Sequence, residues 1–315
     1  MILGIDPKVD YAFKYLMGRD STRAILIDVV NNVLGPPAGQ EITEIELLNP
    51  FNLQETQDDE LSVLDIKARD QSGRRFNIEM QMLPYPYYGK RIIYRWSRFY
   101  PQQLLEGNDY VTLQPTISIS FLNHVLFPKV PDYLLRFHLS EDRHHFTLSD
   151  DIEFHVLELP KFTKTLTQLT SGLDIWLYFL RFAEMIDAAA LPAELRKPSI
   201  VRAVEELTLL TQTDIERERY EARRKAQLDQ NSFINAARRQ GEQEGMQAGM
   251  EAGMQAGMQA GRQMGEQVGE QVGAIHLCQQ ILQLPQTPRE RLLALPPEDL
   301  HRLAENMKKQ ALKGQ

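Results

Sequence analysis

Hydrophobic and polar residues alternate in two short runs between positions 61 and 83, with a polar turn between the runs. In the first run Ile66 and Ala68 alternate with charged residues, and in the second Phe76 and Ile78 alternate with polar ones. A period of two is typical of a β-strand with one buried face, and the DQSG sequence at 70–73 contains the glycine that hairpin turns favour. The pattern therefore predicts a β-hairpin.

The alternation places two carboxylates on one side of this hairpin, because residues two apart on a strand point the same way. Asp65 and Lys67 share a face of the first strand. Three polar residues share a face of the second, namely Asn77, Glu79 and Gln81. A pairing that puts Asp65 opposite Glu79 brings two like charges together, which destabilises a sheet. A bound Mg²⁺ would remove that repulsion; the alternative is a solvated strand face whose charges bind nothing.

Apolar positions before and after the hairpin predict the elements around it. Residues 10–34 have a helical pattern that is interrupted near Gly18, and residues 41–48 alternate as a first strand. Residues 87–106 form an amphipathic helical pattern that ends at a glycine, and the apolar run at 116–122 is typical of a buried central strand. The predicted order is helix, three strands, helix, strand.

The second half of the chain changes from mixed to helical character. Residues 133–139 and 153–159 alternate as two further strands, while 173–187 and 200–210 have helical patterns. The highly charged stretch at 214–240 also has a helical pattern. Short amphipathic helices are predicted at 275–284 and 288–312.

Three arginines form a stripe on the helix predicted at 87–106. Arg91, Arg95 and Arg98 lie at positions i, i+4 and i+7, which bring side chains to one side of a helix. Such a stripe beside an acidic site could contact the phosphates of DNA. The alternative is a solvated face, or one whose charges form salt bridges within the chain.

A glycine recurs at every fourth position from Gly241 to Gly273. Each glycine costs a helix about 1 kcal/mol relative to alanine, so this repeat would destabilise an isolated helix. One explanation is close packing of two such helices in a homo-oligomer, because small residues four apart allow two backbones to approach. The other is a flexible low-complexity spacer.

Composition narrows the class of protein. The chain has 315 residues, enough for about two domains, and one cysteine, Cys278, which excludes an intrachain disulfide. No apolar run approaches the length of a membrane span, and the N-terminus lacks the features of a signal peptide, so we expect a cytoplasmic protein without a membrane partner. The net charge of −8 excludes a broadly basic surface, so any DNA-binding residues must be local to one face.

The hairpin motif resembles the signature of the PD-(D/E)XK nuclease superfamily, in which an Asp is followed by a hairpin and Glu-x-Lys. Asp65 stands at the Asp and Glu79-Met80-Gln81 at the Glu-x-Lys, with Gln81 in place of the lysine. Five blocks in order resemble the recombination-promoting nuclease (Rpn) or putative transposase family, in which Glu-x-Gln is the usual form. They are DPKVDYAFKYLMG at 6–18, EIELLNPF at 44–51, LDIKARDQSGRRFNIEMQM at 64–82, RIIYRWSRFYPQQLLEG at 91–107 and VLELPKF at 156–162.

The resemblance implies a restriction-endonuclease-like α/β core of order αβββαβ, with a mixed sheet flanked by helices, followed by an α-helical C-terminal region. We expect the nuclease core at 1–162 and a helical extension at 163–213. A long charged helix with the glycine repeat would occupy 214–284 as an oligomerisation segment, and a short helical tail 285–315.

The resemblance also implies a metal-dependent DNA endonuclease of DNA recombination or mobile elements. Asp65 and Glu79 would bind Mg²⁺, or Mn²⁺ or Ca²⁺ in its place, and the carbonyl of Met80 could add a ligand. Gln81 can orient water or phosphate but carries no charge, so Lys67 could supply the positive charge of the superfamily's lysine. Asp10 stands where such nucleases often carry an acidic residue on the first helix.

Other roles remain open for these residues. Asp10 could simply be an acid in the first turn of a helix, which the helix dipole favours. Without the lysine of the signature, the chain could be a catalytically degenerate module that binds DNA and acts in recombination. A purely structural oligomerisation protein would explain the glycine repeat but leaves the two carboxylates without a purpose.

Overall fold

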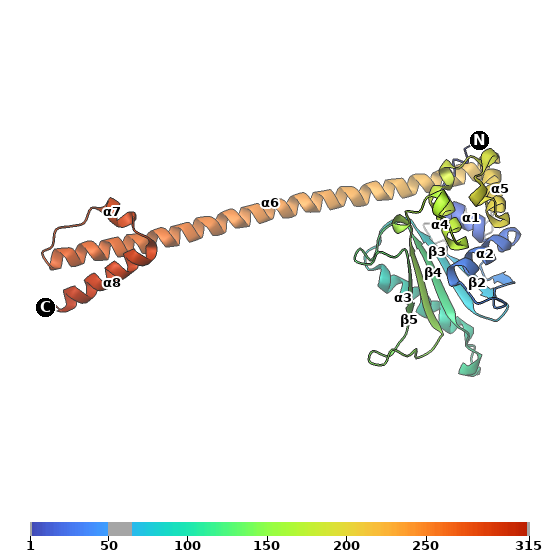
Figure 1. Cartoon of the computed structure of the whole chain (residues 1–315), viewed down its shortest axis with the longest axis horizontal. Helices are drawn as coiled ribbons and strands as arrows, with labels where there is room; N and C mark the ends of the chain where they lie inside the picture. The colour runs from blue at the N-terminus through green and yellow to red at the C-terminus, as the bar shows by residue number, and fades with distance from the viewer. Residues whose placement is uncertain (1, 50–64, 314–315) are drawn as a thin grey trace. The chain divides into compact units, whose positions relative to one another are not determined.

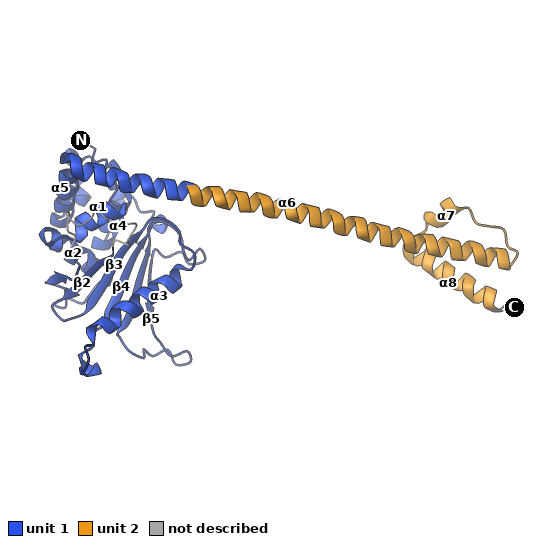
Figure 2. Ribbon diagram, turned by 180° about the vertical axis from the view of Figure 1, so that it is seen from behind, with its two compact units in different colours: residues 1–232 blue, residues 233–315 orange. Residues whose placement is uncertain are grey.

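The structure is a computed structural model that describes residues 2–49 and 65–313. The chain divides into two compact units, Met1–Ser232 and Phe233–Gln315, which Figure 2 distinguishes by colour. The first residues of the predicted hairpin, 61–64, lie outside the described part of the chain.

The hairpin is confirmed for its described residues. Strand β2 (Ile66–Asp70) pairs antiparallel with β3 (Arg75–Gln81). The Asp70 carboxylate organises the turn, since its Oδ1 accepts a hydrogen bond of 2.9 Å from the backbone N–H of Ser72. Gly73 has a φ of 91°, a left-handed conformation that glycine adopts without a steric penalty. The polar turn sequence therefore closes the hairpin as its composition predicts.

Within the described residues, six strands form one mixed sheet in the order β1-β2-β3-β4-β6-β5 (Figure 1). The remaining strands are β1 (Ile45–Leu47), β4 (Thr116–Leu122), β5 (Leu134–His138) and β6 (Ile152–Glu158). Strand β4 pairs in parallel with both β3 and β6, and all of its residues are buried. The prediction of a central buried strand at 116–122 is confirmed.

Helices cover both faces of the sheet. Helix α3 (Tyr88–Phe99) packs on one face, where Tyr88 and Ile92 join a small apolar cluster with Leu122 of β4. The other face carries the main core, to which four helices contribute: α1 (Asp10–Met17), α2 (Arg23–Leu34), α4 (Gly172–Phe182) and α5 (Pro198–Gln212). The order of elements up to residue 122 is the predicted αβββαβ, with the first helical segment divided into α1 and α2.

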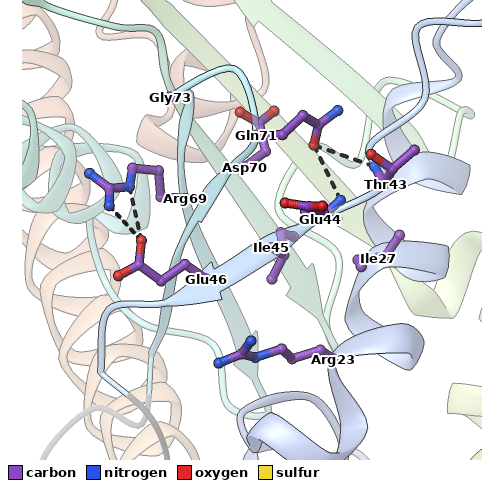
Figure 3. Close-up of a pocket in the computed structure, with 10 residues that line it drawn as sticks. All are labelled: Arg23, Ile27, Thr43, Glu44, Ile45, Glu46, Arg69, Asp70, Gln71 and Gly73. Carbon is purple, nitrogen blue, oxygen red and sulfur yellow. Dashed lines mark hydrogen bonds and ion pairs between the residues drawn. The ribbon is translucent and has the colours of Figure 1, made fainter.

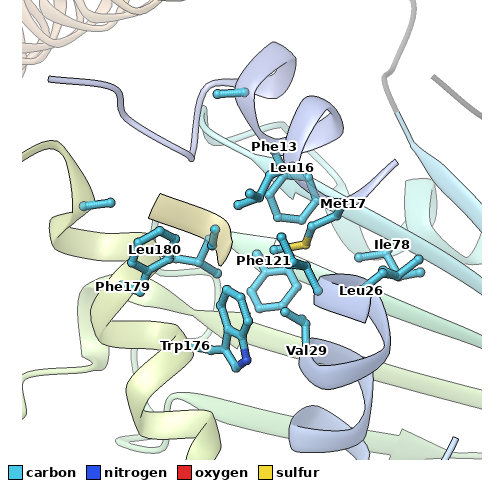
Figure 4. Packing of buried hydrophobic residues seen from close by; sticks show 14 of the residues in the cluster. Phe13, Leu16, Met17, Leu26, Val29, Ile78, Phe121, Trp176, Phe179 and Leu180 are labelled. Atoms are coloured by element: carbon cyan, nitrogen blue, oxygen red, sulfur yellow. The ribbon is translucent and has the colours of Figure 1, made fainter. Parts of the chain in front are cut away.

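Aromatic and aliphatic side chains fill the space between the sheet and the helices α1, α2 and α4 (Figure 4). Phe13 of α1 and Trp176 of α4 are both buried, and the ring of Phe13 lies 5.8 Å from that of Phe121 on β4. The indole N–H of Trp176 donates to Asp28 Oδ2 at 2.7 Å, so the one polar atom of this side chain is satisfied in the core.

Three predicted elements are shorter than the sequence pattern indicates. Helix α3 ends at Phe99 rather than at 106, because Pro101 lacks an N–H and its ring would collide with the preceding helical turn. Strand β1 covers only Ile45–Leu47 of the predicted 41–48. Before it, the backbone of Ile42 bonds to the Asn31 side chain on α2 instead of to a strand. The helix predicted at 173–187 likewise ends early, at Phe182.

Helix α6 (Asp214–Ile281) begins in the first unit, and its start packs onto that unit. Tyr220 is fully buried, and its hydroxyl accepts a hydrogen bond of 2.9 Å from the backbone N–H of Asp6. Arg224 forms a salt bridge of 2.6 Å with Glu184. Residues beyond 213 therefore complete the core of the first unit.

The second unit consists of the rest of α6 with α7 (Arg289–Leu293) and α8 (Pro297–Lys313). The glycine repeat is helical throughout, and α6 continues to Ile281, so the separate helix predicted at 275–284 is wrong. A small apolar core joins the end of α6 to α7 and α8, and comprises Val272, Ile275, Leu292, Leu300 and Ala304. Among the described residues no helix is long and apolar enough to span a membrane.

Candidate active site

The two carboxylates predicted on the hairpin lie beside one another beneath α3. The strand register pairs Ile66 with Ile78, so Asp65, which immediately precedes β2, lies across from Glu79 on β3. Arg95 of α3 reaches both: its Nη1 lies 3.1 Å from Asp65 Oδ1 and contacts Glu79 Oε2. A single guanidinium nitrogen therefore lies between the two acids and offsets their repulsion.

Glu79 is held in place by partners on two elements. The carboxylate is almost completely buried, with 2% of the residue exposed. Its Oε1 accepts hydrogen bonds from the Tyr88 hydroxyl of α3 at 2.5 Å and from Ser120 Oγ of β4 at 3.2 Å. Its Oε2 faces Arg95. A buried charge is tolerated only when it is paired and hydrogen-bonded, and Glu79 meets both conditions.

Burial and like charge change the proton affinity of the site. Burial, together with the negative charge of Glu79, raises the pKa of Asp65 to about 7, against the opposing effect of Arg95. Burial and the charge of Glu79 also raise the pKa of Tyr88 well above its usual value. Tyr88 therefore keeps its proton at neutral pH and acts as a hydrogen-bond donor. The pKa of about 7 means that the protonation state of Asp65 changes with pH in the physiological range.

Lys67 and Arg91 lie near enough to the pair to act on it electrostatically. The positive charges of both residues lower the pKa of Asp65, after the larger effect of Arg95. The Lys67 ammonium lies 5.2 Å from the centre of the Phe99 ring at the end of α3, and the Arg91 guanidinium lies 4.5 Å from that of Tyr85. These cations surround the acids without forming hydrogen bonds to them.

Three other predicted residues lie further from the acids. Gln81 lies two residues beyond Glu79, on the same face of β3, and its side-chain amide donates to the carbonyl of Leu83 at 3.0 Å. Arg98 lies over the ring of Tyr94. Asp10 accepts a 2.7 Å hydrogen bond from the backbone of Tyr11, and burial raises its pKa against the effect of Arg223. The structure thus brings Asp65, Glu79 and Arg95 together and leaves Asp10 in a different environment.

Two partners of Glu79, Tyr88 and Ser120, were missed by sequence reasoning, although each carries a signal. Tyr88 precedes Arg95 by seven positions, two helical turns, so both must lie on one side of α3. Ser120 alternates with apolar residues in TISISFL, which indicates a polar strip on an otherwise apolar strand. Only the sheet order shows that this strip lies next to Glu79.

The donor set suits a hard divalent cation. Asp65 and Glu79 already bracket one cationic nitrogen, so they lie close enough to share a positive charge. Mg²⁺ is commonly held by one or two carboxylates, with waters and phosphate oxygens as the other ligands. The described part of the chain contains no group of three or more His, Cys, Asp or Glu side chains arranged around a common point. Among the described residues, Asp65 and Glu79 are the two acids that could serve as ligands here, with water and phosphate oxygens at other positions.

A separate pocket of about 640 Å³ lies between α2 and the β1–β2 edge of the sheet (Figure 3). Both arginines of its lining form salt bridges, Arg69 with Glu46 at 2.5 Å and Arg23 with Asp20 at 2.6 Å. The side-chain oxygen of Gln71 accepts hydrogen bonds from the backbone N–H groups of Thr43 and Glu44, which precede β1. None of the residues predicted for the site lines this pocket, and it offers no comparably buried carboxylate pair among its ten lining residues.

A mixed sheet with a carboxylate pair on its hairpin and a basic helix above it is the arrangement that the hairpin motif leads us to expect of a nuclease. The comparison with known families agrees: the model of the PD-(D/E)XK nuclease family transposases matches residues 7–237. This match covers most of the chain, and the protein belongs to that family. No curated protein and no solved structure matches it. The family assignment confirms the expected nuclease superfamily and its α/β fold.

Proposed function

We propose that the protein is a divalent-metal-dependent DNA endonuclease that acts in recombination or in the movement of genetic elements. The observation that carries this proposal is the position of Arg95, which bridges the buried carboxylate of Glu79 and the half-buried carboxylate of Asp65 in a family of nuclease-type transposases. Asp65 and Glu79 would hold Mg²⁺, or Mn²⁺ or Ca²⁺ in its place. When bound, the ion would lower the pKa of an attacking water and neutralise charge on the scissile phosphate.

The surrounding residues have distinct roles in this proposal. Tyr88 and Ser120 hold Oε1 of Glu79, which keeps Oε2 directed to the shared position. Arg95 and Arg91 bring positive charge to the place where the phosphate would bind, and Arg98 extends that charge along α3. Lys67 provides a cation on the same strand as Asp65. Gln81 can accept from or donate to water at the end of β3.

The direct test is a plasmid-nicking assay in Mg²⁺ with wild type, Asp65→Ala and the control Asp142→Ala. Asp142 is an exposed acid far along the sequence from the pair. We expect Asp65→Ala to lower the rate by about a hundred-fold or more, as expected when charge stabilisation of the transition state is lost. The control should cut like wild type. Equal rates for folded Asp65→Ala and wild type would refute the proposal.

A second candidate is a DNA-binding module that no longer cuts. It is favoured by Gln81, which replaces a lysine by an uncharged amide that is already bonded to Leu83. This candidate predicts DNA binding by the wild-type chain but no cleavage in Mg²⁺, Mn²⁺ or Ca²⁺. Cleavage that depends on Asp65 would exclude it.

We also propose that the chain self-associates through the glycine repeat. A Cβ atom built on any of the nine glycines from Gly241 to Gly273 would meet no atom within 4 Å beyond the adjacent backbone of its own helix. The methionines of the repeat are exposed as well, for example Met246 at 78% and Met250 at 76%. Close packing against a second copy would compensate for the helix propensity that the glycines lose. Two nuclease sites held together in this way, one from each copy of the chain, could cut two DNA strands.

A further inference from the structure

The outer side of α3 and the segment before it combine exposed tyrosines with basic residues. Tyr85, Tyr87 and Tyr94 are exposed by 50%, 78% and 60%. Each ring lies beside a cation: Arg91 is 4.5 Å from the ring centre of Tyr85, Lys90 is 5.4 Å from that of Tyr87, and Arg98 is 5.9 Å from that of Tyr94. We call these six residues the tyrosine–cation surface.

The surface continues into the candidate active site. Arg91, Tyr94, Arg95 and Arg98 occupy positions i, i+3, i+4 and i+7 of α3, which places them on one stripe of the helix. Arg95 in this stripe contacts Asp65 and Glu79, and Arg91 acts electrostatically on Asp65. A strand that followed the stripe would therefore arrive at the two carboxylates.

The charge of this segment differs from that of the whole chain. Residues 80–105 contain four basic residues and no acidic one, although the chain carries a net charge of −8. A local excess of positive charge on an acidic protein favours a polyanion at that place. A protein partner could also use tyrosine and arginine, but the uninterrupted positive charge and the link to the carboxylate pair favour nucleic acid.

Tyr87 provides an independent indication that the rings are placed for contact. Its φ is 60°, a left-handed conformation that is rare for a bulky residue, and it caps the start of α3 with its ring in solvent. Strained conformations of this kind cluster at binding and catalytic sites. Here the strained residue carries the most exposed ring of the three.

We propose that the tyrosine–cation surface binds unpaired, single-stranded DNA and leads it to the Asp65–Glu79 pair. The inference rests on the proposed nuclease function and specifies its substrate class. Exposed aromatic rings stack on the faces of bases, and those faces are accessible only when the bases are not stacked in a duplex. The neighbouring cations would meet the phosphates of the same strand.

The test compares binding of a fluorescein-labelled oligo-dT of about 20 nucleotides with that of a duplex of equal length, by anisotropy in EDTA, where metal-dependent cleavage is absent. The single strand should bind at least about tenfold more tightly than the duplex. Tyr87→Leu and Tyr94→Leu should each weaken single-strand binding by about fivefold or more, the loss expected for one stacked base. Tyr94→Phe keeps the ring and should bind like wild type, as should Phe146→Leu, which removes an exposed ring elsewhere in the unit.

Several results would overturn the inference. Equal or tighter binding of the duplex would do so, as would equal losses in Tyr94→Phe and Tyr94→Leu. Loss of oligomeric mass in Tyr87→Leu would assign the surface to a second copy of the chain instead. Cleavage assays in Mg²⁺ on both the plasmid and the labelled single strand separate this inference from the proposed function: Asp65-dependent cleavage without a preference for binding the single strand refutes the inference alone, and single-strand binding without cleavage of either DNA refutes the enzyme alone.

Discussion

The carboxylate site and the glycine repeat represent two opposite situations within one chain. Glu79 is buried and has partners on β4 and α3, whereas the nine repeat glycines of α6 have open space where a side chain would be. In the first region, residues from distant parts of the sequence provide the hydrogen-bond and ion-pair partners of the polar atoms, and these partners indicate what each atom does. In the second, local backbone hydrogen bonds form the helix, and the described chain supplies no neighbour that would explain the glycines. The role of buried polar residues can therefore be inferred from the contacts that they make. The role of an exposed periodic face has to be tested by experiments on binding to a partner.

The Tyr88 hydroxyl is the most direct way to perturb the buried region. Tyr88→Phe keeps the ring in its apolar cluster but removes the 2.5 Å hydrogen bond to Glu79 Oε1. We expect the affinity for Mn²⁺ to fall about ten- to a hundred-fold, as is usual when a residue that orients a metal ligand is lost. Isothermal titration calorimetry measures this change. Tyr94→Phe, the same substitution on an exposed ring, should retain wild-type affinity, and unchanged affinity in Tyr88→Phe would show that the hydroxyl does not orient Glu79.

The raised pKa of Asp65 predicts that metal binding depends on pH. Because the metal needs the deprotonated carboxylate, a proton competes with it below the pKa of about 7. Affinity should therefore fall about tenfold between pH 8 and pH 6, as the ionised fraction of Asp65 falls. Calorimetry at the two pH values provides the test. A metal affinity that is the same at both would mean that Asp65 is not a ligand or is ionised throughout this range.

The same shift affects the stability of the metal-free chain, with a sign that can be worked out. The folded-state pKa of Asp65 lies above its ordinary value of 3.8, so the folded chain binds more protons than the unfolded chain between these values. The contribution of Asp65 to stability is therefore greatest at low pH and is lost as the pH rises through about 7. Thermal melts of wild type and Asp65→Asn, without metal, should converge below about pH 4, diverge as the pH rises from there to about 7, and keep a constant difference above that.

Substitutions in the arginine stripe should have a smaller effect on DNA binding, because several arginines share the contacts with phosphates. If Arg91 and Arg98 contact phosphates, each change to Ala should weaken DNA binding several-fold for all sequences alike and reduce the salt dependence by about one charge. Anisotropy titrations at several salt concentrations measure both quantities. Arg143→Ala, which removes an exposed arginine on a loop between β5 and β6, is the matched control. Unchanged binding together with a lower melting temperature would show that the stripe is structural.

Self-association through the glycine repeat can be tested by measuring the oligomeric mass of the full chain and of a chain without the repeat. The expected difference in the number of copies is about twofold. A chain that ends after Ser232 should be a monomer, and the full chain at least a dimer, by light scattering coupled to size exclusion. Ending the chain after Ser232 retains Tyr220, which is buried in the core of the first unit.

A substitution within the repeat separates pairing from helix stability. Replacing Gly249, Gly253 and Gly257 with Leu raises helix propensity but blocks close approach of a second helix, so the mass of the full chain should fall. A wild-type chain that elutes as a monomer at tens of micromolar would leave the repeat as a spacer.

The sequence alone determined the hairpin, the central strand and the order of elements, because these depend on local periodicity and turn composition. The alternation around Asp65 and Glu79 placed both acids on one face, and the spacing of Arg91, Arg95 and Arg98 placed the arginines on one stripe. Predictions from local sequence were wrong where a contact with a residue distant in the sequence determines the length of an element. The side chain of Asn31 took the backbone bonds of Ile42 and shortened β1.

Only the tertiary structure could show which helix lies over the acids and which strand lies beside them. Arg95, Tyr88 and Ser120 are distant from Asp65 in sequence, and their meeting depends on the parallel pairing of β4 with β3 and on the packing of α3 across both. The same packing raises the pKa of Asp65, because burial and the charge of Glu79 act through space and leave no trace in local sequence. The glycine repeat is the converse case: its helix and its four-residue register follow from the sequence, and the described chain supplies no contact that explains the register.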